Sequence, residues 1–152
     1  MARSTFVYVS YIRTTPEKLW SALTTDTAFM QQYWFGTRCE SQWQAGSAWK
    51  MVQTSGTVTD IGEIVEAQAH RRLVIRWRNE FRPELKAEGD SLCTIELEPA
   101  GTAVKLTITH SIERDGSKLI EAVSGGWPKI ISNLKSLLEN GSIALQNPYP
   151  PH

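Results

Sequence analysis

The sequence has no surplus of charge of either sign, few cysteines and no long apolar run. Its 152 residues carry 16 Lys and Arg against 16 Asp and Glu, so the formal net charge is zero. A nucleic-acid binder needs a basic excess to neutralise phosphates, and this chain has none. No apolar stretch approaches the roughly 20 residues that cross a bilayer, and the first residues lack the apolar core of a signal peptide. We therefore expect a cytoplasmic protein with neither nucleic-acid nor membrane partners.

The chain also lacks the residue patterns of common metal and cofactor sites. Its two cysteines, Cys39 and Cys93, form neither a CxxC pair nor a zinc pattern, which suits a reducing compartment. Asp60, Glu63 and Glu66 have the spacing of neither a metal cage nor a paired-carboxylate site. No phosphate-binding loop, dinucleotide fingerprint or nucleophile motif occurs. We therefore predict no metal and no cofactor, and these absences favour binding over catalysis.

What the sequence does contain is a series of segments typical of β-strands. The first is rich in β-branched and aromatic residues, and six more follow after two short helical segments. Short turns separate the later six, which implies antiparallel neighbours in a meander, with residues 81–89 as the longest loop. Alternation in the last strands gives the sheet one apolar face that needs a cover. The predicted strands are residues 6–12, 37–44, 47–53, 57–67, 72–80, 91–98 and 102–113.

Three helices complete the predicted elements. The Thr-Pro-Glu run at 15–17 is a good helix start, and a second short helix is expected near residues 27–33. Between residues 119 and 138 apolar side chains recur every three or four positions, which indicates an amphipathic helix ended by Gly141. Pro128 lies inside this pattern and lacks an N–H to donate, so we expect a kink or a break there.

The order of these elements, and several short motifs in sequence, match a known fold family. The motifs lie at residues 15–20, Tyr33-Trp34, Gly46 with Trp49, residues 63–66, 71–77, 106–110 and 126–135. The sequence departs from the usual motif of this fold family at Ser47, the position at which a second glycine is usual. On these segments the sequence resembles the START-like (SRPBCC) superfamily and, within it, the single-domain bacterial type of the activators of heat-shock-protein ATPase homologues.

This resemblance implies an α+β helix-grip fold. A curved antiparallel sheet of about seven strands would wrap on the long C-terminal helix, with two short helices after the first strand. Residues 1–141 would form the domain. The prolines among residues 147–151 predict an extended tail over residues 142–152, in which Tyr149 packs either on a second subunit or on nothing. The oligomeric state stays open.

The resemblance also implies three candidate functions. Superfamily members enclose a cavity between sheet and helix, and many bind lipids, polyketides or other apolar molecules. We therefore expect non-catalytic binding of a hydrophobic or aromatic small molecule. The alternatives are a co-chaperone-like interaction protein that stimulates a heat-shock-protein ATPase, and a cyclase-like enzyme.

His110 is the most conspicuous candidate site residue. Alternation places it on the same inward face as Leu106 and Ile108, where it would offer a ligand a polar contact or act as an acid or base. The other interpretation is a buried histidine held by structural hydrogen bonds. The predicted ligand-binding set combines it with aromatic and aliphatic residues: His110, Trp34, Trp49, Trp77, Ile95, Leu106, Ile108, Val123 and Trp127.

Arginines are frequent between residues 71 and 82, but they do not require a nucleic-acid partner. Arg76 and Arg78 share the outer face of their strand, and we expect them to pair with Glu96 and Glu98 on the next strand. Such exposed pairs make a solvated charged face.

Overall fold

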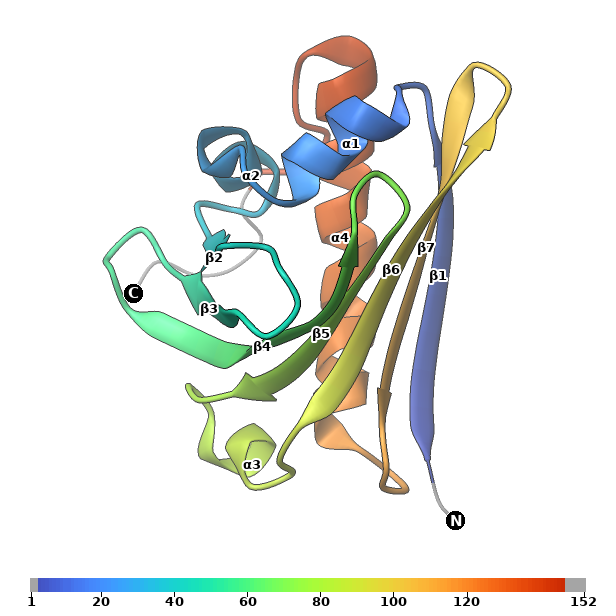
Figure 1. The fold of residues 1–152 in the computed structure, drawn as a ribbon. Coiled ribbons are helices and arrows are strands. Elements are labelled where there is room, and N and C mark those ends of the chain that lie inside the picture. The colour runs from blue at the N-terminus through green and yellow to red at the C-terminus, as the bar shows by residue number, and fades with distance from the viewer. Residues whose placement is uncertain (1–2, 147–152) are drawn as a thin grey trace.

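A computed structural model describes residues 3–146, which form one sheet curved around a long helix (Figure 1). The strands are β1 (Ser4–Ile12), β2 (Arg38–Ser41), β3 (Ala48–Val52), β4 (Val58–Gln68), β5 (Arg72–Asn79), β6 (Ser91–Ala100) and β7 (Ala103–Ile112). The helices are α1 (Pro16–Leu23), α2 (Thr27–Tyr33), α3 (Pro83–Lys86) and α4 (Lys118–Asn140). The predicted helix-grip fold, with seven strands and two short helices after the first, is confirmed.

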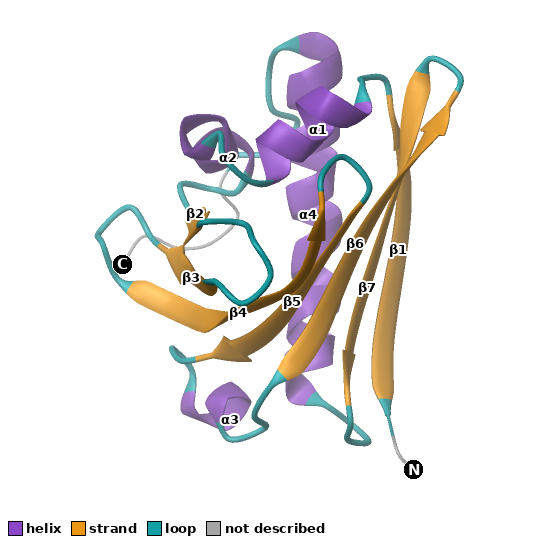
Figure 2. Cartoon of the chain, viewed as in Figure 1, coloured by secondary structure: helices purple, strands orange, loops and turns teal. Residues whose placement is uncertain are grey.

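Strands β2 to β7 form a meander, and β1 is added at its far edge beside β7. Its order is β1-β7-β6-β5-β4-β3-β2, and every neighbouring pair is antiparallel. Strands β2 to β7 follow one another in space as in sequence, whereas β1 pairs with β7 from Ser4↔Ile112 to Ile12↔Val104. Figure 2 shows the connections between these strands, of which the one from β5 to β6 contains α3. Strands β1 and β2 are therefore the two edges of the sheet.

The helix ends follow the local sequence. The side chain of Thr15 accepts a hydrogen bond from the backbone N–H of Lys18, and that of Asp26 accepts from Phe29, so both short helices have polar N-caps. Gly141 ends α4 with φ of 81°, a left-handed conformation that glycine adopts without strain. Helices α1 and α2 lie at one end of the sheet and α3 at the other (Figure 1).

Helix α4 runs unbroken through Pro128, so the expected break is wrong. Proline removes only one backbone hydrogen bond, and contacts on both sides hold the helix in place. Before Pro128, Leu119 and Ile120 are buried in a small cluster with Leu85 and Ile112. After it, the helix packs along β1 and β7.

The N-terminus of α4 is held by a residue distant in sequence. Ser117 is its N-cap, and the carboxylate of Glu88 accepts hydrogen bonds from the backbone N–H of Lys118 and of Leu119, at 2.8 and 3.2 Å. A carboxylate at this position also interacts favourably with the helix dipole. The loop after α3 therefore fixes where the covering helix begins.

The inner face of the sheet is the apolar face predicted by alternation. Leu106, Ile108 and His110 of β7 are fully buried. Trp49, Gly62 and Trp77 occupy paired positions on β3, β4 and β5. A side chain at Gly62 would collide with the backbone of β5, so this position requires glycine. The indoles of Trp49 and Trp77 pack with centroids 4.6 Å apart.

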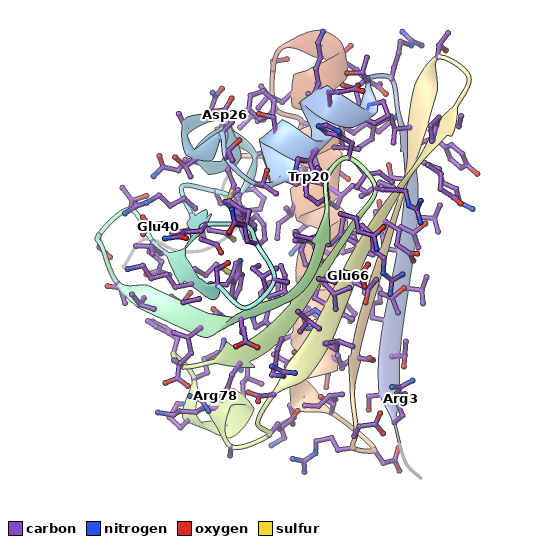
Figure 3. The ribbon with its side chains drawn as sticks, viewed as in Figure 1. Arg3, Trp20, Asp26, Glu40, Glu66 and Arg78 are labelled. Carbon is purple, nitrogen blue, oxygen red and sulfur yellow. The ribbon has the colours of Figure 1, made fainter. Side chains whose placement is uncertain are left out.

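The outer face carries ion pairs, although not the expected ones. The register places Arg72, rather than Arg76, opposite Glu96, and these two form a bridge of 2.9 Å. Arg76 reaches back to Glu63 on β4, so its predicted pairing with the β6 carboxylates is wrong. Arg78 likewise pairs at 2.7 Å with Glu80, just past the end of its own strand. Figure 3 labels Glu66 and Arg78 among these charged side chains.

Two segments differ from simple loops. Residues 81–89, expected to be a loop, contain the single-turn helix α3. The predicted tail begins at residue 142, but its first residues turn back along α4, where Asn133 accepts hydrogen bonds from the backbone N–H of Ala144 and of Leu145. The rest of that tail, with Tyr149, lies outside the described residues.

Candidate functional site

A cavity of about 590 Å³ lies between one half of the sheet and the first half of α4. Strands β3, β4 and β5, helix α3 and the segment after α2 frame it, as can be followed in Figure 2. Its apolar lining is Trp34, Phe35, Met51, Trp77, Leu85, Leu119, Ala122, Val123, Gly126, Trp127 and Ile130. Its polar lining is Thr37, Gln53, Thr54, Ser55, Asp60, Asn79 and Arg82. The combination of apolar walls and a few polar groups is typical of small-molecule sites.

Four of the nine predicted ligand-binding residues line this cavity: Trp34, Trp77, Val123 and Trp127. Their three indoles form a connected group, because Trp127 lies 5.4 Å from Trp34 and 5.9 Å from Trp77 between ring centroids. Both pairs are edge-to-face, the geometry that aromatic rings prefer. Ligand contact by these four residues stays a prediction.

The other five predicted residues pack in the core beside the cavity: Trp49, Ile95, Leu106, Ile108 and His110. Trp49 is covered by Trp77, and its Nε1 is buried with no hydrogen-bond partner among the described residues. The remaining four lie on β6 and β7, whereas the cavity lies under β3 to β5. Strand alternation identified the inward face correctly, but it carries no information about which part of that face stays uncovered.

His110 has its two ring nitrogens engaged in hydrogen bonds. Nε1 of Trp127 donates to Nδ1 at 3.2 Å, and Nε2 lies 2.8 Å from the hydroxyl of Ser91. That hydroxyl donates its single proton to the carbonyl of Trp77, at 3.0 Å. Nε2 must therefore carry the proton and donate to Ser91, which defines a neutral imidazole.

The surroundings of His110 favour that neutral form. Burial lowers the pKa of His110 to about 4, because the charged form would be desolvated. Neither nitrogen is left to contact a ligand, and the ring lies between the two indoles that do line the cavity. His110 thus positions Trp77 and Trp127 and ties β7 to α4.

The cavity wall also contains a residue that the sequence analysis did not select, Asp60. It is only 5% exposed, and its Oδ2 accepts hydrogen bonds from Trp77 Nε1 at 2.6 Å and Asn79 Nδ2 at 3.3 Å. Burial raises the pKa of Asp60, and these hydrogen bonds oppose that rise only in part. The sequence does contain a pattern that could have identified Asp60. Alternation along β4 places it on the same inward face as Gly62 and Ile64.

One wall of the cavity is built from strained backbone. Phe35 and Gly36 adopt φ values of 52° and 87°, and the hydroxyl of Thr54 donates to the carbonyl of Gly36 at 3.0 Å. This bond joins the segment after α2 to the β3–β4 turn, and both contribute lining residues. A left-handed conformation at a bulky residue such as Phe35 persists only where its surroundings hold it.

The described residues provide no metal centre. Between residues 3 and 146, no three His, Cys, Asp or Glu side chains are grouped so as to hold an ion. Cys39 and Cys93 are buried and free, and burial raises the pKa of both thiols, which makes them poor nucleophiles. The same part of the chain has no helix with the length and apolar character needed to span a bilayer.

The fold and cavity together define a protein of the helix-grip, START-like class. The chain belongs to the family described as Activator of Hsp90 ATPase homolog 1-like protein, whose model matches residues 13–139. A search of curated proteins finds no match.

Solved structures show the same fold at low sequence identity. A protein from Mesorhizobium loti aligns with a TM-score of 0.76 and 22% identity, over 92% of this chain and 100% of that one. The Aha1 dimer from Colwellia psychrerythraea aligns with a TM-score of 0.72 and 18% identity, over 91% and 98%. An HSP90 activator from Plasmodium falciparum aligns with a TM-score of 0.70 and 22% identity, over 88% and 95%.

Proposed function

We propose that this domain binds a hydrophobic or aromatic small molecule, without catalysis, in the cavity between the sheet and α4. The observation that carries the proposal is the cavity itself: about 590 Å³, with three indoles and six aliphatic side chains among its lining residues. An apolar ligand removed from water gains roughly 25 cal/mol for each Å² it buries, and these walls offer that environment. Trp34, Trp77, Val123 and Trp127 would be the contacting residues.

A filled-cavity variant tests this proposal. We expect the neutral fluorescent probe N-phenyl-1-naphthylamine to bind one per chain, because its rings match the apolar lining. Val123→Trp should weaken binding by about tenfold or more, since a large side chain would occupy the space. Val65→Trp is the matched control, because Val65 lies exposed on β4 outside the cavity. Equal binding by all three proteins would contradict the proposal.

A second candidate function follows from the family. Its members are named for activation of Hsp90 ATPase, and one structural neighbour is an HSP90 activator. On that basis the chain would be a co-chaperone-like interaction protein with a chaperone as partner. The test is the chaperone's ATPase rate with and without the purified chain, and an unchanged rate removes this candidate. Val123→Trp separates the two functions, because stimulation through the surface would survive filling of the cavity.

A further inference from the structure

One charged group in the cavity wall has no counterpart to neutralise it. Asp60 is 95% removed from solvent, and it has no ion-pair partner within 4.0 Å among residues 3–146. The groups that donate to it are neutral: the indole of Trp77 and the amide of Asn79, with a further contribution from the Thr59 hydroxyl. A buried carboxylate held only by neutral donors keeps much of its desolvation cost.

The charges around Asp60 add to this deficit. Among charged side chains, the carboxylate of Glu80 raises the pKa of Asp60 further, although Glu80 is itself paired with Arg78 at 2.7 Å and with Lys86 at 3.3 Å. Arg82 also lines the cavity, but its guanidinium is exposed to solvent and pairs with Glu84 at 2.8 Å. Arg82 is therefore screened by water and by its own partner. Among the described residues, Asp60 is therefore left at the buried end of the cavity without a cation paired to it.

The remaining walls suit an organic cation. Trp34, Trp77 and Trp127 present aromatic rings, whose faces attract ammonium groups within about 6 Å of the ring centroid. The same rings bury the apolar body of a ligand. A ligand cation would form the ion pair that Asp60 lacks within the protein. The attraction between the two charges would be strong, because little water reaches this part of the cavity to screen it.

From this geometry we propose that Asp60 makes the cavity selective for organic cations: aromatic or aliphatic amines whose ammonium group pairs with this carboxylate. This inference rests on the proposed function and names the ligand class of that same cavity. It also means that Asp60, and not His110, makes the polar contact with the ligand.

The experiment compares three ligands that share one apolar body and differ in the head group. 4-Phenylbutylamine carries an ammonium group, 4-phenyl-1-butanol a neutral hydroxyl and 4-phenylbutyrate a carboxylate. Dissociation constants come from the shifts of the indole N–H signals in two-dimensional NMR, which report directly on Trp77 and Trp127. We expect the amine to bind about tenfold or more tightly than the alcohol, and the carboxylate to bind weakest.

Two variants locate the source of that preference. Asp60→Asn keeps an oxygen to accept from Trp77 but removes the charge, and it should abolish the preference for the amine over the alcohol. Glu80→Gln is the matched control, because it removes the same charge at a half-buried position that does not line the cavity. It should retain most of the preference.

The outcomes separate the two proposals. Binding of alcohol and amine with equal affinity overturns the selectivity inference and leaves the cavity function standing. A preference for the amine that survives in Asp60→Asn also overturns the inference, since the charge responsible would lie elsewhere. If none of the three ligands shifts an indole signal, the proposed function fails, and the inference fails with it.

Discussion

Trp127 Nε1 donates a 3.2 Å hydrogen bond to Nδ1 of His110, and this bond joins the covering helix to the sheet one residue before Pro128. Both groups are almost completely buried. The indole can only donate, so the bond exists only while Nδ1 of His110 is unprotonated. The link between α4 and β7 thus depends on the protonation state of one imidazole.

Removal of that imidazole should destabilise the fold. His110→Ala leaves a cavity, strands the buried N–H of Trp127 and removes the hydrogen bond that the Ser91 hydroxyl accepts, while Ser91 keeps its bond to the carbonyl of Trp77. We expect the free energy of unfolding to fall by about 3 kcal/mol, as measured by urea denaturation. His70→Asn, in an exposed turn with φ of 69° that asparagine tolerates, is the control and should change little. A loss below about 1 kcal/mol in His110→Ala would show that the network contributes little.

The same residue predicts how stability depends on pH. The folded pKa of His110 is lowered to about 4, while the unfolded value is about 6.5. Between these values the unfolded chain binds more protons, so the stabilisation is complete above pH 6.5 and is lost as the pH falls toward 4. The expected loss is about 3 kcal/mol.

A comparison of variants isolates this effect from other titrations. His110→Gln does not titrate in that range, so the difference between its pH profile and that of the wild type reports His110. Asp60 acts with the opposite sign, because its raised folded pKa favours the fold as the pH falls, and it is present in both proteins. Parallel profiles between pH 4 and 7 would be incompatible with a buried neutral His110.

The contact between Gly36 and Thr54 gives a prediction about the cavity wall. A methyl group at Gly36 would lie 2.5 Å from Oγ1 of Thr54 and displace the hydroxyl from its hydrogen bond. Gly56 has a similar φ, 91° against 87°, but nothing lies near its missing side chain. Gly36→Ala should therefore cost about 1 kcal/mol more than Gly56→Ala in thermal or urea unfolding. Equal costs would mean that only backbone strain matters at both sites.

Asn133 is predicted to hold the segment after α4. Its amide donates to the carbonyl of Leu145 and accepts from the N–H groups of Ala144 and Leu145, while the residue is fully buried. Asn133→Ala should lower the free energy of unfolding by about 2 kcal/mol, because it removes three hydrogen bonds made by a fully buried amide. Amide hydrogen exchange should accelerate at Ala144 and Leu145.

Asn140→Ala is the control for that experiment. Asn140 lies in the last turn of the same helix and is exposed. It should leave exchange at Ala144 and Leu145 unchanged. Slow exchange in the Asn133 variant would show that other contacts hold the segment.

Local sequence predicted the elements well because their signals are local. Alternation set the strands and their inward face, polar caps at Thr15 and Asp26 set the short helices, and Gly141 ended α4. The break considered at Pro128 does not occur, because neighbouring packing compensates for one lost hydrogen bond. Local sequence also did not predict the hydrogen bonds by which Asn133 in α4 holds Ala144 and Leu145.

The site was predicted only in part, because its position depends on tertiary packing. Four wall residues were identified, but Ile95, Leu106 and Ile108 face a covered region of the same sheet. His110 drew attention as a lone inward polar group, whereas Asp60 shares that property and faces the cavity. An inward carboxylate on a strand is the more informative signal, since carboxylates are rarely buried without a partner.

The pairing of β1 with β7 imposes an order of events during synthesis. Strands β2 to β7 pair with neighbours in sequence, so each hairpin forms as soon as its second strand leaves the ribosome. The partner of β1 is made last among the strands, about a hundred residues later. Strand β1, which includes the apolar residues Val7, Val9 and Tyr11, therefore stays without its partner until β7 has been made, and unpaired strands of this kind make nascent chains aggregate or engage folding factors.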